Sequence, residues 1–430
     1  GIYEETIRNL PKSTRTSLVE NEATVNPPLY YTLGSIFYKS TTSFSIFERV
    51  FAVRFLSLVL FLLIVFITFK ISQIIFGKNK KLQLVLTTII AFNPMLVFSS
   101  TGVLPDPLTN LLFSIIILIS LIILNNSLNI KYLVFASLTI IAGSLTRQQF
   151  LIALPILSIA VFLKAIIEKK VRPIFILMGL IITLGTFSSI VPQLRYLQDF
   201  SFPEIQAPNF KLLLSLNFIS YLRVFLVETN NQTFAWYWGV YRWLSLTLPP
   251  VIYQIIRVLV LLSLSGLFIK IIKDIFQKNF KESINLYFLI IASLIYAVIL
   301  IIWDYFFRLS NGFSFGIQGR YFFPLAVTHL SILLFGLNQL FEFFFKKYAR
   351  YLILALVVLV ILFNDLSIFY VASSYYNTSS LATFINQASQ YKPQIFKGVS
   401  IIVIMATKLA LQIIFLFRFR KWFVENSVAY

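Results

Sequence analysis

Long apolar runs constrain the fold of this chain more than any other feature. Hydrophobic residues make up 58% of the sequence and charged residues only 12%, and a helix needs about 20 apolar residues to cross a bilayer. A soluble globular domain is therefore excluded. Eleven runs are candidate spans, at 51–76, 84–100, 109–125, 132–146, 150–167, 174–192, 248–272, 285–303, 321–343, 349–366 and 396–417.

The predicted fold is an all-α polytopic membrane protein with about eleven transmembrane helices. Because the chain begins in a polar segment at Gly1, we expect one further span before it, which would make about twelve. The expected organisation has four parts: a first outer loop at 1–50, helices of the N-terminal half at 51–192, a large outer loop at 193–247 and helices of the C-terminal half at 248–430.

The basic residues predict the orientation. The net charge is +20, and the Lys and Arg clusters lie in the short loops between apolar runs. If every run crosses, these clusters share one side, which the positive-inside rule makes cytoplasmic. Residues 1–50, Asp106 and Arg147 then lie outside. Because the charge is scattered and no soluble face collects it, nucleic acid is not expected as a partner.

The rarest residue types exclude several kinds of chemistry. The chain has no cysteine and one histidine, His329, so disulfides, thiol catalysis and a His-rich metal site are excluded. His329 lies inside an apolar run, where it is either a buried, hydrogen-bonded side chain or a proton relay. The first reading is favoured.

Three charged residues beside apolar runs are candidates for chemistry. Asp106 is either an N-cap, with Pro107 at the first helical position, or a carboxylate that holds an arginine or binds a donor phosphate through a divalent cation. Arg147 sits between two short spans and needs a carboxylate or an anionic ligand. Arg320 follows a glycine, and its guanidinium can bind phosphate oxygens in a bidentate manner.

Two features of the outer segments point to the membrane surface or to a ligand. Apolar residues recur at helical spacing over 210–227, as expected for a helix lying in the interface. The segment 234–243 is dense in aromatic residues, among them Trp236, and contains Arg242. It fits an interfacial belt, and it fits a platform for sugar rings or a lipid chain equally well.

The motif Asn-Pro-Pro-Leu-Tyr-Tyr at 26–31 precedes the first long span. Its two prolines predict an extended turn, with tyrosines anchored at the interface. The motif resembles the (His/Asn/Gln)-Pro-Pro-Leu-Tyr-Tyr element of bacterial GT-C membrane glycosyltransferases, a superfamily that includes protein O-mannosyltransferases and aminoarabinose transferases. Further motifs follow in the order typical of that group, at 48–57, 93–94, 105–106, 145–148, 236–249 and 318–324.

The resemblance implies transfer of a sugar from a polyprenyl-phosphate carrier to an acceptor at the outer face of a bacterial cytoplasmic membrane. In such enzymes an acidic residue of the first outer loop removes the acceptor proton, and cationic side chains hold the departing phosphate. The acidic residue that usually follows an opening span is not visible here, and Glu4 and Glu5 are its nearest equivalents. The implied catalytic residues are Glu4, Glu5 and Asp106, and the implied substrate-binding residues are Asn26, Tyr30, Tyr31, Arg147, Trp236, Arg242, Arg320 and Tyr321.

Two other functions remain open. A flippase or transporter for lipid-linked or amphipathic substrates would require broken helices and an internal pseudo-symmetry, and the sequence suggests neither. A polysaccharide polymerase or ligase would use the same kind of donor. The expected partners are the lipid-linked donor, an acceptor that is a lipid, a glycan or a protein, and membrane lipids. No cofactor is expected beyond the divalent cation considered for Asp106.

Overall fold

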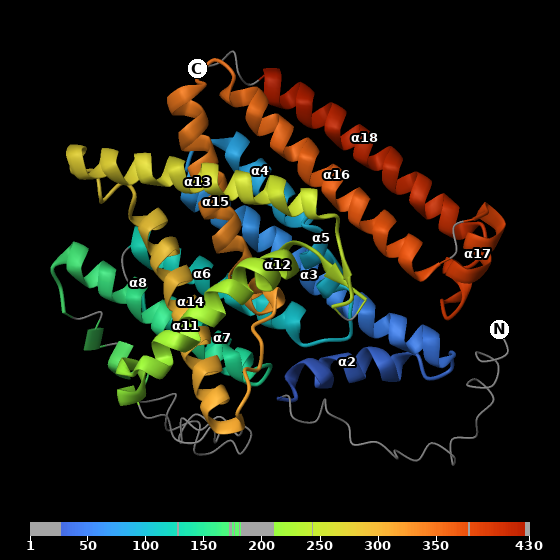
Figure 1. The fold of residues 1–430 in the computed structure, drawn as a ribbon, viewed down its shortest axis with the longest axis horizontal. Coiled ribbons are helices and arrows are strands. Elements are labelled where there is room, and N and C mark those ends of the chain that lie inside the picture. Colours follow the sequence, from blue (N-terminus) through green and yellow to red (C-terminus); the bar gives the residue numbers. More distant parts are fainter. Residues whose placement is uncertain are drawn as a thin grey trace.

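A computed structural model describes residues 27–126, 129–171, 174–175, 177–179, 181, 210–242, 244–376 and 379–425. The chain is an all-α polytopic membrane protein. Its elements are α2 (Leu29–Ser40), α3 (Ile46–Phe76), α4 (Lys80–Ala91), α5 (Pro94–Ser100), α6 (Asp106–Asn125), α7 (Ile130–Ser144), η3 (Gln148–Ile152), α8 (Ala153–Glu168), η5 (Phe210–Leu214), α11 (Leu216–Glu228), η6 (Thr229–Thr233), α12 (Phe234–Trp238), β1 (Val240–Tyr241), β2 (Leu246–Thr247), α13 (Pro250–Gln277), α14 (Ile284–Asn311), η7 (Gly319–Leu325), α15 (Ala326–Phe344), α16 (Ala349–Tyr375), α17 (Leu381–Ser389), η8 (Gln394–Phe396) and α18 (Ser400–Glu425). Figure 1 shows these helices in one bundle.

Within the described residues, eight helices are long and apolar enough to span a membrane. They correspond to eight of the eleven predicted runs. The predicted run 84–100 is a bent pair, because α4 and α5 meet at an angle of 54°. The run 132–146 is the short apolar helix α7, and the run 174–192 lies almost entirely outside the described residues.

The break between α4 and α5 has a local cause. Asn93 caps α5 by accepting a hydrogen bond from the backbone nitrogen of Leu96, at 2.9 Å, and Pro94 follows at the first helical position. A proline there lacks the N–H that would continue the preceding helix. The helical bundle therefore contains a bent helix pair, which was not predicted from the sequence.

Hydrogen bonds between distant segments define the two ends of the bundle. The backbone nitrogen of Leu29 donates to the Leu145 carbonyl at 2.9 Å, and the Ser57 hydroxyl donates to the Gly102 carbonyl at 2.9 Å. These contacts gather the starts of α2 and α6 and the end of α7 at one end. We call this end the Asp106 face.

The opposite face carries the basic loops. The Asn125 amide, at the end of α6, bonds the side chain of Asn285 in α14 at 2.7 Å. The Lys81 ammonium, at the start of α4, lies 5.3 Å from the ring of Phe423 near the end of α18. The predicted grouping of basic clusters on one side agrees with these contacts.

Residues 27–50 differ from the predicted loop. Pro28 has helical backbone angles and is the N-cap of α2, so Leu29 and both tyrosines form its first turn instead of an extended turn. The first span begins at Ile46, because Ser45 and Glu48 form a reciprocal capping box.

Glycines allow a close crossing of α13 and α15. A Cβ on Gly266 of α13 would lie 1.9 Å from the carbonyl oxygen of Gly336 in α15. Ser263, one turn earlier, donates to the Leu333 carbonyl at 2.9 Å. Small residues that allow close backbone approach, with a polar side chain bonded across the interface, are typical of helix packing in membranes.

Candidate functional site

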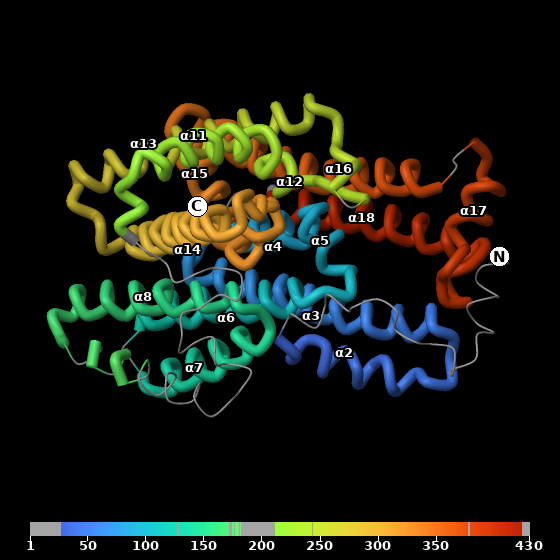
Figure 2. The backbone as a smooth tube through the Cα atoms, turned by 60° about the horizontal axis from the view of Figure 1, so that its bottom comes forward, coloured from blue at the N-terminus to red at the C-terminus, as the bar shows by residue number. Residues whose placement is uncertain are grey.

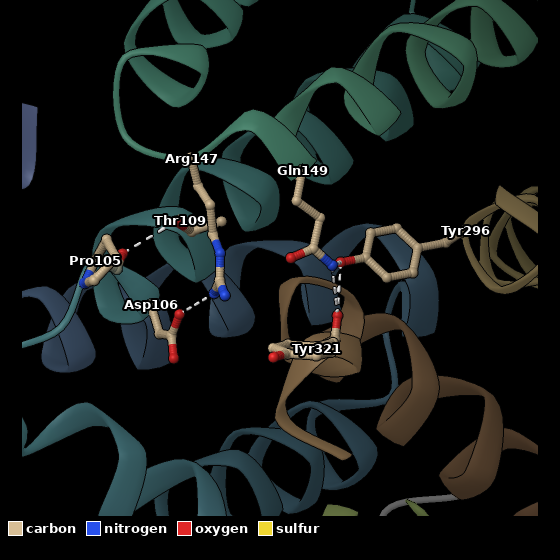
Figure 3. A network of polar contacts seen from close by, with 7 residues as sticks. All are labelled: Pro105, Asp106, Thr109, Arg147, Gln149, Tyr296 and Tyr321. Atoms are coloured by element: carbon tan, nitrogen blue, oxygen red, sulfur yellow. Dashed lines mark hydrogen bonds and ion pairs between the residues drawn. The ribbon is translucent and has the colours of Figure 1, made fainter. Parts of the chain in front are cut away.

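The candidate site begins with Asp106, at the start of α6. Pro105 is the N-cap of α6, and Asp106 is the first helical residue. The predicted N-cap role of Asp106 was therefore wrong. Its carboxylate instead accepts a hydrogen bond from Nη1 of Arg147, as Figure 3 shows. A negative charge in the first turn is also favoured by the helix dipole. Asp106 therefore holds an arginine, one of the two charged roles considered for it.

Arg147 lies in the connection between α7 and η3. Its backbone nitrogen donates to the Gly143 carbonyl at 2.9 Å, which fixes the corner of the chain. The exposed fraction of its side chain is 24%, against 8% for Asp106, so the pair is largely out of solvent. An ion pair in such surroundings is screened less than one at a surface.

Tyr321 connects this pair to the second arginine. The guanidinium carbon of Arg147 lies 5.4 Å from the centroid of the Tyr321 ring, and that of Arg320 lies 5.7 Å from it. Both distances fall within the range of cation–π attraction. Two guanidinium groups from distant parts of the chain thus share one aromatic ring.

Arg320 has unused capacity for a ligand. Among the residues that the structure describes, it forms no ion pair, and its Nε is buried without a hydrogen-bond partner. A buried donor without a partner is unfavourable. An anion beside Arg320 would satisfy it.

The backbone of Tyr321 is fixed by two other helices. Its carbonyl accepts hydrogen bonds from the Tyr296 hydroxyl at 2.7 Å and from the Gln149 amide at 3.0 Å. Figure 3 shows both side chains converging on this carbonyl. The start of η7 is therefore tied to α14 and η3, which positions Arg320 and Tyr321 relative to Arg147.

Gly319 permits the aromatic segment to pack against the site. A Cβ on Gly319 would lie 2.1 Å from the backbone nitrogen of Tyr237 and 2.4 Å from the carbonyl carbon of Trp236. Because glycine has no Cβ, it permits this close approach of the α12 backbone.

The two tyrosines of the 26–31 motif have different surroundings. Tyr30 is fully buried, and its hydroxyl lies 2.8 Å from Oγ of Ser57. It is a core residue and cannot touch a ligand, contrary to the predicted binding role. Burial raises the pKa of the Tyr31 phenol, the Asp106 carboxylate raises it further, and Arg147 lowers it. Tyr31 is therefore near the ion pair.

The remaining predicted residues fall elsewhere. Arg242 donates to the Ser374 hydroxyl at 3.2 Å and lies 5.8 Å from the ring of Tyr375, so it contacts the end of α16 and not the Asp106 pair. The side chain of Trp236 packs against the core. Glu4, Glu5 and Asn26 lie outside the described residues.

One apolar cavity adjoins the site, and a second lies beside the first. The first, of about 310 Å³, is lined by Phe322, which directly follows Tyr321, and by Trp238. The second, of about 220 Å³, lies between α13, α15 and α16 and is also lined by Trp238. His329 lines the first cavity, with Nδ1 3.4 Å from the Tyr237 hydroxyl. The hydrogen bond in the favoured reading of His329 agrees with this contact, and the side chain is half-buried.

Two buried polar residues were not identified from the sequence. Asn110 lies one turn after Asp106 on the same face of α6, and its Nδ2 is buried without a partner. Asp304, at the end of α14, accepts hydrogen bonds from the Tyr221 hydroxyl at 2.7 Å and from the backbone nitrogen of Gly316 at 3.2 Å. A carboxylate at the end of an apolar run is a signal that could have singled out Asp304.

The arrangement offers little to a metal ion. Across the described ranges, no three His, Asp or Glu side chains are close enough together to hold one. Asp106 would be a single carboxylate ligand and already bonds Arg147. The two arginines are better suited to bind an anion directly.

Comparison with known proteins identifies a family for most of the chain. Residues 4–329 match the profile of a family described as predicted membrane protein (DUF2142), and this range includes Asp106, Arg147 and Arg320. No curated protein and no solved structure gives a match.

Proposed function

Because the chain belongs to the DUF2142 family of predicted membrane proteins, we propose an activity at a membrane: transfer of a sugar from a polyprenyl-phosphate-linked donor to an acceptor hydroxyl. One observation carries the proposal. Arg147 and Arg320 flank the ring of Tyr321 at 5.4 and 5.7 Å, beside the buried carboxylate of Asp106.

The chemistry needs such a pair of cations. The acceptor oxygen bonds to the anomeric carbon of the sugar, and the bond from that carbon to the donor phosphate oxygen breaks. Polyprenyl phosphate leaves with the electron pair, and the acceptor proton passes to a carboxylate. Fixed positive groups stabilise the charge that develops on the leaving phosphate.

We assign the roles accordingly. Arg147 and Arg320 bind the phosphate, and Asp106 orients Arg147 through their ion pair. Glu4 or Glu5 accepts the proton, as the resemblance to GT-C enzymes implies. The cavity lined by Phe322 accommodates the start of the isoprenoid chain, because it is apolar and adjoins Tyr321.

The proposed location is a bacterial cytoplasmic membrane, with the Asp106 face outward. The basic loops are at the opposite face, and the positive-inside rule favours such a face on the cytoplasmic side. The acceptor is then a lipid, glycan or protein at the outer surface.

The test measures donor consumption. The purified protein, reconstituted in liposomes, is incubated with radiolabelled polyprenyl-phosphate sugars and extracts containing acceptors. We expect transfer by the unmodified chain, loss of at least about 100-fold in Arg320→Ala because a charge-stabilising group is removed, and no change in Arg223→Ala. Arg223 is a matched control, because it is exposed and lies on α11. Equal rates in all three proteins would refute the assigned site.

One observation favours a second candidate, transport of a lipid-linked substrate. The α4–α5 pair is a broken helix with a buried cap, Asn93, and discontinuous helices are typical of transporters. In the same liposomes, a flippase would move the labelled donor between leaflets with its sugar still attached. A polymerase or ligase would instead release polyprenyl phosphate or diphosphate and lengthen or attach a glycan.

A further inference from the structure

A third cavity, on the Asp106 face, has a different chemical character from the two apolar ones. It has a volume of about 750 Å³ and lies between the start of α3, the end of α16 and the segment around α17. This volume is within the range of about 300–1,000 Å³ that is typical of small-molecule sites. Figures 1 and 2 both show α17 at the same end of the molecule as the start of α3.

The cavity wall is rich in aromatic rings and amides. The aromatic residues are Phe47, Phe51, Tyr375, Tyr376 and Tyr391, and they stand beside the amides of Gln387 and Gln390. Aromatic rings offer flat faces for the C–H edges of sugars, and amides donate and accept hydrogen bonds. This combination suits a carbohydrate better than an acyl chain.

Among the described residues that line the cavity, the charged ones are both cations, Arg54 and Lys392. Lys392 is held in place by hydrogen bonds to the Tyr376 hydroxyl, at 3.0 Å, and to the Ala388 carbonyl, at 2.5 Å. Within the described part of the chain Arg54 has no ion pair, and its guanidinium lies 5.1 Å from the ring of Phe51. Both cations can therefore bind an anionic group.

The backbone at the rim is strained. Tyr391 has a φ of 57°, a conformation that is uncommon for residues other than glycine. The Tyr391 ring lies 5.4 Å from that of Phe47, so it joins the segment after α17 to α3 at the cavity wall. Strain of this kind persists where the surroundings hold it and is concentrated at functional sites.

We propose that this cavity is a binding site for an anionic carbohydrate, a sugar that bears a carboxylate or a phosphate. The aromatic rings stack on the sugar, the glutamines bond its hydroxyls, and Arg54 with Lys392 binds the charged group. Arg242 adds positive charge at the rim, because its guanidinium lies 5.8 Å from the ring of Tyr375. The site does not depend on the proposed transferase activity, since it is defined by binding alone.

Calorimetry on the full chain in phosphatidylcholine nanodiscs tests this site. The soluble probes are tetragalacturonic acid, maltotetraose as its neutral counterpart, and inorganic phosphate. We expect tetragalacturonic acid to bind at least about tenfold more tightly than either of the others, which corresponds to about 1.4 kcal/mol. Equal affinity for the charged and neutral tetrasaccharides would refute the proposal.

Variants and lipids locate the site and identify the source of the sugar. Arg54→Ala should weaken binding about tenfold, whereas Lys39→Ala, an exposed cation at the end of α2, should not. Equal weakening in both would overturn the assignment to this cavity. The source of the sugar is identified by adding a glucuronosyl diacylglycerol to the nanodisc. Competition with the soluble probe indicates a glycolipid, and no competition indicates a free glycan. Either result supports the site. Binding of phosphatidylglycerol but of no sugar would overturn it.

Discussion

At the scale of single residues, the Asp106–Arg147 pair is the most consequential contact. Both side chains are mostly out of solvent, so removing one leaves the other charged and unpaired, which is costly in a buried setting. Asp106 also stands in the first turn of α6, where the helix dipole favours a negative charge. Stability and activity should therefore respond differently to changes at this pair.

A single and a double variant at this pair separate the effect on stability from the effect on activity. We expect Asp106→Asn to lower the free energy of unfolding by about 3 kcal/mol, the lower end of what breaking a buried pair costs. The double variant D106R/R147D should recover part of this loss, because opposite charges face each other again, and yet show no sugar transfer, because the cation has moved. Thermal unfolding in detergent and the donor assay measure the two quantities. Recovery of transfer in the double variant would contradict the role of Arg147.

The adjacent tyrosines of the 26–31 motif form a second matched pair. Tyr30→Phe removes a buried hydroxyl bonded to Ser57 and should destabilise the protein by about 1 kcal/mol without changing donor affinity. Tyr31→Phe should leave the melting temperature unchanged and weaken donor binding, because the Tyr31 phenol lies near the ion pair. Melting curves and donor titrations distinguish the two. The opposite pattern would show that Tyr31, not Tyr30, is the structural residue.

At the scale of secondary-structure elements, close helix approach is set by glycine. The crossing of α13 and α15 depends on Gly266 and Gly336, whose backbones leave no room for a side chain. α15 continues directly from η7, which carries Arg320 and Tyr321. A shift of α13 against α15 should therefore reach the candidate site.

Gly266→Ala tests this dependence. The new methyl group would lie 1.9 Å from the Gly336 carbonyl oxygen, so the helices must separate, and we expect a loss of about 2–3 kcal/mol, as for overpacking in a core. Ser265→Ala, on the exposed side of the same helix, should change stability by no more than about 0.5 kcal/mol. Equal melting temperatures for both variants, measured in the same detergent, would mean that the crossing is not tight.

At the scale of the whole molecule, the candidate binding groups and the basic loops lie at opposite faces. The ion pair, the two arginines and the cavity lined by Arg54 belong to the Asp106 face, and the basic loops belong to the other. The chain contains no cysteine, so single introduced thiols report topology without background.

Single cysteines at Thr42 and Thr101 should react with a membrane-impermeant maleimide in intact cells. Cysteines at Gln277 and Lys346 should react only after the membrane is opened. All four positions are exposed and lie at or beyond the ends of helices, so the reagent can reach each one from its own side of the membrane. Labelling of the Gln277 and Lys346 variants in intact cells would reverse the proposed orientation and place the candidate site in the cytoplasm.

Much of the architecture could be predicted from the sequence, and less of the site. Hydropathy is a local property, and about 20 apolar residues suffice to identify a span. For this reason nearly every predicted run within the described residues corresponds to a helix. The bend between α4 and α5 was missed, although Asn93 and Pro94 are a local signal for it.

The sequence by itself determined the membrane-embedded helical fold and the collection of basic loops at one end, because both follow from the order of apolar and charged residues along the chain. Only the tertiary structure decided which charges meet. Asp106 and Arg147 are 41 residues apart, and Arg242, an equally good candidate by residue type, contacts α16 instead. Partners of this kind are set by how helices pack, and packing depends on the shapes of side chains from distant segments, which no local pattern contains.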